Sequence, residues 1–122
     1  MISALSGSLP AGVRVLVATR PVDFRRGADG LAATVQSILQ QDPFSGTVFV
    51  FRSKRADRVK LLLWDRDGFL LIYKRLEEGV FRFPAVSANQ RSVRVSAQEL
   101  SLLLWGIDPA SVRRQKRYAR PA

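Results

Sequence analysis

The stretch that decides the fold runs from Asp42 to Pro84 and reads DPFSGTVFVFRSKRADRVKLLLWDRDGFLLIYKRLEEGVFRFP. Six of the seven Phe residues lie in it, so most of the large apolar area available for burial is here. Short runs of aromatic and aliphatic residues alternate with turn residues, a pattern typical of an antiparallel meander. We predict four strands in this stretch, at residues 47–52, 59–65, 69–76 and 80–83.

The turns between these runs predict how the strands connect. Asp67-Gly68 is a strong hairpin signal between the second and third runs. Glu77-Glu78-Gly79 predicts a further hairpin into residues 80–83, which Pro84 ends. The run at residues 59–65 is almost wholly apolar, as expected of a strand that is covered on both faces.

On the N-terminal side we predict one more strand and the longer of two helices. The strand spans residues 13–18, and the loop at 19–27 contains Asp23, a candidate N-cap. Apolar residues at helical spacing predict a helix over residues 28–41, which ends before Pro43. Residues 1–12 are small and rich in Gly and Pro, so we expect a flexible leader.

On the C-terminal side, residues 92–95 are a candidate short strand. Ser96 and Glu99 form a capping box that begins a short helix at residues 97–105. We expect both helices to cover one face of the sheet. The predicted fold is therefore α+β, an antiparallel β-meander of about five strands covered by one longer and one short helix. It forms a single domain at residues 13–108, followed by a basic tail at 109–122.

Composition removes several classes of chemistry. The 122 residues include no Cys and no His, so there is no disulfide, no thiol nucleophile, and neither the commonest general base nor the commonest metal ligand. No apolar run approaches the roughly 20 residues that cross a bilayer, and the first residues lack the features of a secretory signal. We therefore expect a cytoplasmic protein without a cofactor.

Charge is the dominant global feature. Twenty Lys and Arg residues against ten Asp and Glu residues give a formal net charge of +10, and sixteen of the cations are Arg. The planar guanidinium group suits phosphate recognition, so we predict a polyanionic partner. Three groups of cations are candidate phosphate contacts: the helix-start pair Arg25 and Arg26; the basic turn with Arg52, Lys54, Arg55, Arg58 and Lys60; and the tail with Arg113, Arg114, Lys116, Arg117 and Arg120.

Each group also has an ordinary interpretation. The turn is equally well explained as a solvated hairpin tip, the Arg25-Arg26 pair as partners of Asp23 or Asp29, and the tail as a solubilising segment. In the tail, Tyr118 is a candidate for stacking on a base.

Two catalytic alternatives have weaker support. Asp65 and Asp67 form an Asp-x-Asp pair that suits Mg²⁺ and a nuclease, but turn chemistry at Gly68 already explains both residues. The second alternative is Lys60 or Lys74 as the base for a Ser nucleophile, which no spacing in the sequence supports.

Several linked motifs resemble the TnpB-type accessory proteins of the IS66 insertion sequences, encoded by the second open reading frame of those elements. The likeness runs from Val13 to Pro84 and excludes the tail after Pro109. It includes Val13-Arg-Val-Leu-Val-Ala-Thr19, Asp23-Phe-Arg-Arg-Gly27, Asp42-Pro-Phe-Ser-Gly46, Asp57-Arg-Val-Lys-Leu61, Trp64-Asp65 and Tyr73-Lys-Arg-Leu-Glu77. Phe24 stands where the family pattern has Met, which keeps an apolar side chain there.

The resemblance implies a function without established chemistry. Such proteins are encoded beside a transposase and a second small protein, and no catalytic residues come with the family. We therefore expect a non-enzymatic accessory protein for DNA transposition, whose basic surface binds insertion-sequence DNA through phosphates while another face contacts the transposase or the co-encoded protein. The alternative is a protein–protein adaptor without DNA binding, whose basic face meets an acidic segment of the transposase.

Overall fold

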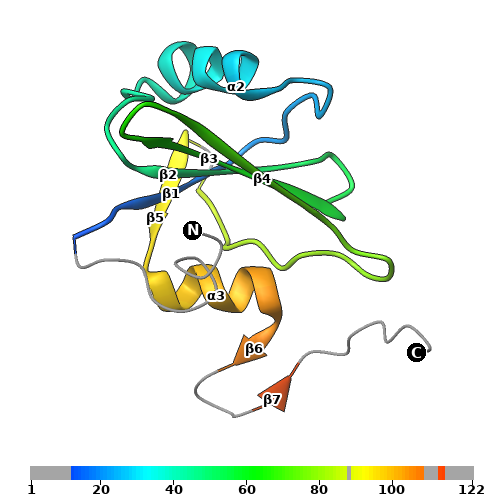
Figure 1. The fold of residues 1–122 in the computed structure, drawn as a ribbon. Helices are drawn as coiled ribbons and strands as arrows, with labels where there is room; N and C mark the ends of the chain where they lie inside the picture. Colours follow the sequence, from blue (N-terminus) through cyan, green and yellow to red (C-terminus); the bar gives the residue numbers. More distant parts are fainter. Residues whose placement is uncertain (1–11, 88, 109–112, 115–122) are drawn as a thin grey trace.

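One mixed sheet of five strands forms the centre of the molecule, between two helical layers (Figure 1). The computed structural model describes residues 12–87, 89–108 and 113–114. The strands lie in the order β4-β3-β2-β1-β5 and the sheet is mostly antiparallel, which confirms the α+β class. Their bounds are β1 Val15–Ala18, β2 Val48–Arg52, β3 Arg58–Asp65, β4 Gly68–Arg75 and β5 Ser92–Val95.

The sheet is a meander only over β2, β3 and β4. Strand β1 pairs with β2 in parallel, with Val15 opposite Val48. A parallel pair needs a crossover connection, and here helix α2 (Ala28–Thr34) and the π-helical turn η1 (Val35–Leu39) supply it. The mostly antiparallel sheet is therefore confirmed, with the β1–β2 pair as its parallel exception, and the meander is shorter than the five strands predicted.

The fifth strand is β5, and residues 80–83 are not a strand. These residues leave the sheet and pass the turn before β3, where the Phe81 N–H donates to the Ala56 carbonyl at 2.8 Å. The Phe81 side chain is buried in the core, so the apolar alternation that suggested a strand marks a packing contact instead. Strand β5 pairs antiparallel with β1, with Val93 opposite Val17.

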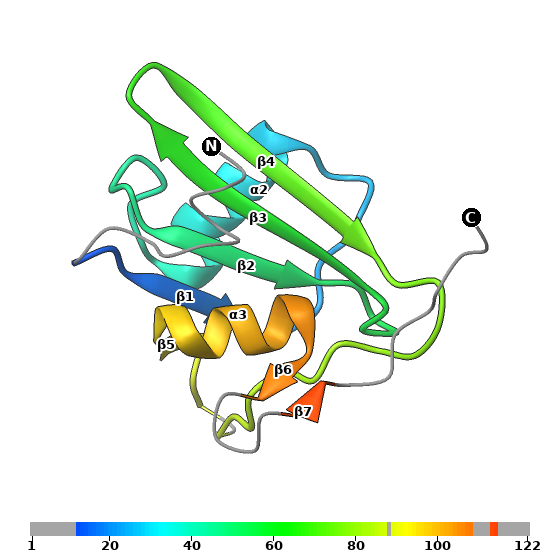
Figure 2. The same ribbon diagram turned by 60° about the horizontal axis from the view of Figure 1, so that its bottom comes forward.

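The two helical layers cover opposite faces of the sheet, contrary to the expectation of one covered face (Figures 1 and 2). Against α2 and η1 lies a cluster built on Leu31, Val35, Leu39, Phe49, Phe51 and Leu62. Helix α3 (Ala97–Trp105) places its buried Leu residues against a second cluster built on Val17, Val50, Val59 and Leu61. Strand β3 contributes to both clusters, which confirms its prediction as a strand covered on both faces.

The helix ends test the capping predictions. The capping box before α3 is confirmed, because the Glu99 N–H donates to Ser96 Oγ at 3.0 Å and the Ser96 N–H donates to Glu99 Oε1 at 2.8 Å. The N-cap of α2 is Gly27, with no side-chain cap bond, so the prediction for Asp23 was wrong. The first helical segment ends at Gln40, which adopts the left-handed conformation with φ 56°.

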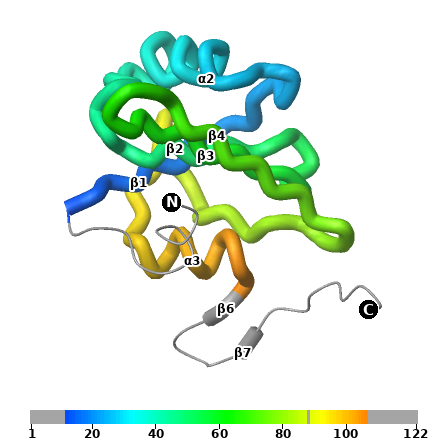
Figure 3. The backbone as a smooth tube through the Cα atoms, viewed as in Figure 1, coloured from blue at the N-terminus to red at the C-terminus, as the bar shows by residue number. Residues whose placement is uncertain are grey.

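The smooth trace in Figure 3 shows the path that links these layers. From β1 the chain rises to α2, returns through the meander, passes beneath the sheet, joins its edge as β5 and then continues into α3. Two short strands, β6 (Ile107–Asp108) and β7 (Arg113–Arg114), pair antiparallel after α3. None of the helices in the described ranges is long and apolar enough to cross a membrane.

Candidate nucleic-acid interface

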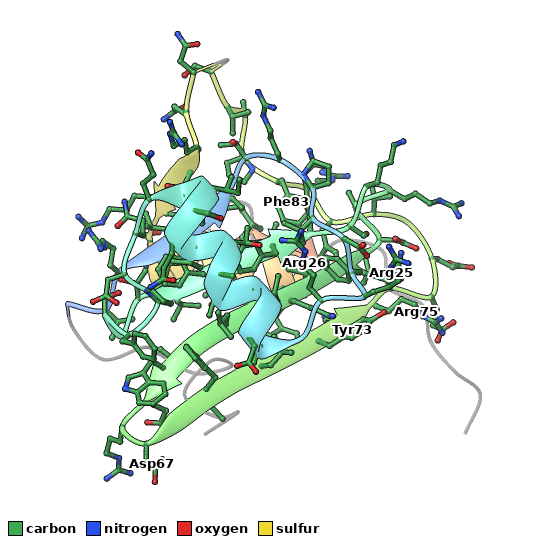
Figure 4. All side chains as sticks on the ribbon, turned by 90° about the horizontal axis from the view of Figure 1, so that it is seen from above. Arg25, Arg26, Asp67, Tyr73, Arg75 and Phe83 are labelled. Carbon is green, nitrogen blue, oxygen red and sulfur yellow. The ribbon has the colours of Figure 1, made fainter. Side chains whose placement is uncertain are left out.

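Half of the twelve predicted phosphate contacts lie at one end of the sheet, which we call the basic end: Arg25, Arg26, Arg52, Lys54, Arg55 and Arg58. It is formed where β1, β2 and β4 finish and β3 begins, and Arg58 lies opposite Arg75 in the β3–β4 register. Figure 4 shows Arg25, Arg26 and Arg75 at this end, whereas Asp67 lies at the opposite end. Cations from three separate sequence segments therefore share one region of the surface.

The basic turn between β2 and β3 is organised by Ser53, whose side chain is buried. Ser53 Oγ donates to Asp57 Oδ1 at 3.1 Å and accepts from the Arg58 N–H at 3.2 Å. This arrangement fixes the turn from inside and leaves Lys54 and Arg55 exposed at its tip. The turn therefore presents two cations on a backbone that is already ordered.

Arg25 is largely engaged with Asp23. Its Nη2 donates to Asp23 Oδ2 at 2.7 Å, and its backbone N–H donates to Oδ1 at 2.9 Å. The pKa of the Asp23 carboxyl lies well below its usual range, mainly because the Arg25 side chain donates to it and secondly because the Arg25 backbone N–H does. The pairing interpretation of this arginine is therefore confirmed.

Arg26 is oriented differently. Its Nη1 donates to Thr34 Oγ1 at 2.6 Å, and that hydroxyl in turn donates to the Gly30 carbonyl at 3.0 Å. Thr34 is buried at 4% exposure, so the bond directs the guanidinium group along the first turn of α2. The remaining N–H groups of Arg26 stay available because a guanidinium has five.

Lys60 does not belong to the exposed basic surface. It is only 6% exposed, and its Nζ donates to the carbonyls of Phe24 at 2.8 Å and Arg26 at 2.9 Å. Its ammonium also lies 5.0 Å from the Phe24 ring centre and 5.4 Å from that of Tyr73. Lys60 thus ties the loop before α2 to the sheet, and the sequence position next to a basic turn was misleading.

Acidic neighbours neutralise only part of this end. Within the described part of the chain, three ion pairs form: Arg25 with Asp23, Arg58 with Asp57 at 3.6 Å, and Arg75 with Glu77 at 3.7 Å. Arg52 lies with its guanidinium carbon 5.9 Å from the Phe83 ring centre. Cations outside these three pairs, such as Lys54 and Arg55, leave the basic end with a positive excess.

Three further arginines join this region that sequence reasoning did not select. Arg75 ends β4 beside Arg58, whereas Arg20 and Arg91 line one cleft although they are far apart in sequence. The pairing of β1 with β5 brings them together, because Thr19 and Arg91 directly flank the paired ends of these strands. No local sequence signal reports a strand pairing across more than seventy residues.

The tail contributes less to the described structure. Arg113 and Arg114 form β7, whose backbone pairs with β6. The other predicted tail contacts, Lys116, Arg117 and Arg120, lie outside the described residues, as does Tyr118. Their proposed role in binding phosphate stays a prediction.

The residues of the catalytic alternatives lie elsewhere. Asp65 and Asp67 flank Arg66 at the β3–β4 hairpin, away from the basic end. Among the described residues, no group of three acidic, His or Cys side chains is placed to hold a metal ion. Lys74 Nζ donates to the Leu104 carbonyl at 2.5 Å and lies 4.2 Å from the Trp105 ring centre, so it links β4 to the end of α3.

An aromatic cluster occupies the hairpin end. Phe44, Trp64 and Phe69 have ring centres 5.0–5.4 Å apart. Phe44 is nevertheless 53% exposed, so part of this apolar cluster faces solvent. The two ends of the sheet therefore differ in chemistry, one cationic and the other aromatic.

Comparison with known proteins gives a consistent result. Residues 13–114 match the family described as IS66 Orf2 like protein. The uncharacterized protein y4jC of Sinorhizobium fredii is 48% identical over 104 residues, covering 85% of this chain and 87% of the relative. The uncharacterized protein y4hO of the same organism is 41% identical over 102 residues, covering 82% and 87%. No solved structure matches. The family match continues past Pro84 to residue 114, so the sequence resemblance was drawn too short.

Proposed function

The chain belongs to the IS66 Orf2-like family, and from that membership together with the basic end we propose that it is a non-catalytic accessory protein for transposition of an insertion sequence. It acts in the cytoplasm on the DNA of the element. Its basic end contacts phosphates, and another face meets the transposase or the co-encoded small protein. The observation that carries this proposal is the ordered turn at the basic end that exposes Lys54 and Arg55, two cations outside the ion pairs formed there.

The chemistry of the contact follows from this arrangement. Guanidinium and ammonium groups on an ordered turn neutralise phosphates and release condensed counterions, whatever the base sequence. Such contacts position a protein on a duplex, whereas base-edge contacts give specificity. We therefore propose binding that depends strongly on salt and weakly on sequence.

The test is DNA binding across a salt series. The purified protein is titrated with a fluorescent duplex carrying an insertion-sequence end and with a random duplex of equal length. The variant Lys54→Gln/Arg55→Gln removes two exposed cations, and its log K against log salt slope is expected to be shallower by about 2. Arg66→Asn is the matched control, because it removes a cation from the opposite end and Asn tolerates the positive φ of 55° there.

The results separate the possibilities. Binding that is insensitive to salt, or equal losses in the turn variant and the Arg66 control, would contradict phosphate contact at the basic end. A strong preference for the element end would instead make the protein an end-recognition factor.

The adaptor alternative has one specific observation in its favour. The aromatic cluster of Phe44, Trp64 and Phe69 is partly exposed at the end away from the cations, and aromatic residues are enriched in protein interfaces. In that case the protein does not bind DNA, and Phe44→Ser weakens its co-purification with the transposase. Absence of DNA binding at low salt, together with retained transposase binding, would favour the adaptor over the DNA-binding proposal.

A further inference from the structure

A cleft of about 590 Å³ opens beside the basic end, at the point where β1 finishes. Its walls come from the loop after β1, from α2 and η1, and from the segment before β5. Three arginines line it, Arg20, Arg26 and Arg91, and only one carboxylate, that of Asp23. A cleft of this size admits a group as large as a nucleotide.

Hydrogen bonds hold two walls of the cleft together. Thr19 Oγ1 donates to the Gln90 carbonyl at 2.7 Å, and the Thr19 N–H donates to the Arg91 carbonyl at 3.1 Å. On the other side, Arg91 Nη1 donates to the Ile38 carbonyl at 3.0 Å, near the end of η1. Gln90 and Arg91 are thereby held between β1 and η1, so these walls of the cleft are in place without a ligand.

The arginine side chains are partly restrained as well. Arg26 is bound to the buried Thr34 hydroxyl and Arg91 to a backbone carbonyl, and both of these partner residues also line the cleft. Arg26 and Arg91 each use one guanidinium N–H in these hydrogen bonds, so each has further N–H groups that can donate to a second acceptor. Restrained guanidinium groups lose less conformational entropy when they bind an anion.

The single acidic group in the lining does not oppose an anion as strongly as its charge suggests. Both Asp23 oxygens accept hydrogen bonds from Arg25, which lies outside the lining. With three arginines and one aspartate, the lining itself carries a formal charge of +2 (three positive, one negative). The cleft is therefore electropositive.

Part of the lining is apolar. Pro21, Val22, Ile38 and Leu39 contribute to it, and Ile38 is 53% exposed although it is a large aliphatic residue. A free phosphate ion has no use for such a surface, whereas the sugar and base of a nucleotide do. The combination of cations and aliphatic side chains thus fits a nucleotide better than an inorganic anion.

We propose that this cleft binds one unpaired, phosphate-bearing nucleotide at the end of a DNA strand, with its phosphate at Arg20, Arg26 and Arg91 and its sugar and base against Pro21 and Ile38. This inference deepens the proposed function and rests on it, because the strand belongs to the same DNA that the basic end contacts. A free nucleotide shares this chemistry, and the experiment separates the two sources.

The experiment uses the full chain labelled with ¹⁵N. Amide shifts of Thr19, Gln90 and Arg91 are followed during titration with inorganic phosphate, with thymidine 5′-monophosphate, and with a short single-stranded oligonucleotide carrying or lacking a 5′-phosphate. We expect the phosphorylated oligonucleotide to bind about tenfold more tightly than the unphosphorylated one, which corresponds to a change of one phosphate contact. The mononucleotide is expected to bind more weakly than the phosphorylated strand and more tightly than phosphate.

Two variants test the residues. Arg20→Gln removes an exposed cation and is expected to weaken binding of the phosphorylated strand about tenfold without changing the thermal midpoint. Arg26→Gln is also expected to weaken binding about tenfold, and it should lower the thermal midpoint because it removes the bond to the buried Thr34 hydroxyl. Arg66→Asn at the opposite end serves as the control. Amide shifts spread over the hairpin end, or equal effects of Arg20→Gln and Arg66→Asn, would overturn the proposal.

Other outcomes are equally decisive. Equal affinity for inorganic phosphate and for the mononucleotide would overturn the role of the apolar wall. A mononucleotide that binds as tightly as the phosphorylated strand would overturn the strand-end source in favour of a free nucleotide.

If duplex DNA binds with a steep salt dependence while no nucleotide shifts the cleft amides, the cleft inference fails and the proposed function stands. If the cleft amides shift and no duplex binds, the proposed function fails instead.

Discussion

Replacing Lys60 with Met should detach the loop before α2 from the sheet while leaving the sheet intact. The Lys60 ammonium donates to two carbonyls of that loop, those of Phe24 and Arg26, from a position that is 6% exposed. Met keeps an unbranched apolar stem of similar length, so the substitution removes the donor and little of the packing.

The magnitude follows from the contacts. A hydrogen bond from a charged donor contributes roughly 1.5–3 kcal/mol, and relief from burying the ammonium offsets part of that when the charge is removed. The ring contacts at 5.0 and 5.4 Å to Phe24 and Tyr73 add about 0.5–1 kcal/mol each. We expect a net loss of about 3 kcal/mol in the free energy of unfolding, or about 10 °C in thermal midpoint for a domain of this size.

The assay combines denaturant unfolding with amide hydrogen exchange. Exchange should accelerate in the loop around Phe24 to Gly27 and stay slow in β2 and β3, because the sheet pairing is unchanged. Lys54→Met is the control, since Lys54 is exposed and its loss should leave stability within about 0.5 kcal/mol. A Lys60→Met protein as stable as the parent, with unchanged exchange in the loop, would refute the structural role of this lysine.

Three further predictions concern other parts of the fold. Ser96→Ala removes the capping-box hydroxyl and should cost about 1 kcal/mol in urea unfolding, whereas Ser101→Ala within the same helix should not; equal effects would contradict the cap. Phe49→Ala empties a fully buried site between the sheet and α2 and should cost about 3–5 kcal/mol by denaturant midpoint, unless the site collapses. Asp23→Asn concerns pH: because Arg25 holds the pKa of this carboxyl below its unfolded value, the pair stabilises fully above about pH 4 and is lost as the pH falls through the folded pKa. The parent should therefore exceed Asp23→Asn in stability at pH 7 and lose that advantage in acid, and a constant difference across pH would disprove the linkage.

Local sequence signals predicted the elements well where one residue pattern determines one element. The hairpin predicted at Asp67-Gly68 does join β3 to β4, although its two loop residues are Arg66 and Asp67 and Gly68 already pairs with Asp65. The capping box begins α3 as predicted, and both signals work because they depend on neighbours in sequence. The parallel pairing of β1 and β2 was missed because it depends on a crossover that no local pattern encodes. Residues 80–83 were wrongly predicted to form a strand because alternating apolar residues also occur where a loop buries a side chain, as Phe81 does here.

In the candidate site, too, the features that depend on local sequence were predicted and those that depend on the fold were not. The charge excess and the basic turn are visible in sequence, and the structure places Lys54, Arg55 and Arg58 together. Burial is not visible, so Lys60 was grouped with them although it faces inward. The cleft arginines Arg20 and Arg91 were missed because the β1–β5 pairing that unites them spans most of the chain.

The motifs that carry the family resemblance contain basic residues that bind groups within the protein and a basic residue that can still bind a ligand. Asp23-Phe-Arg-Arg-Gly27 and Asp57-Arg-Val-Lys-Leu61 meet in space through Lys60, whose ammonium binds carbonyls within the first motif. Lys60 is buried and bound to two backbone carbonyls, so its presence in the second motif is explained by folding, whereas Arg25 is exposed and pairs with Asp23 at the surface. Arg26 uses one of its N–H groups in the bond to Thr34 and lies in the lining of the cleft. Of the two arginines in the first motif, Arg26 is therefore the one that lines the cleft and can also donate to a bound phosphate.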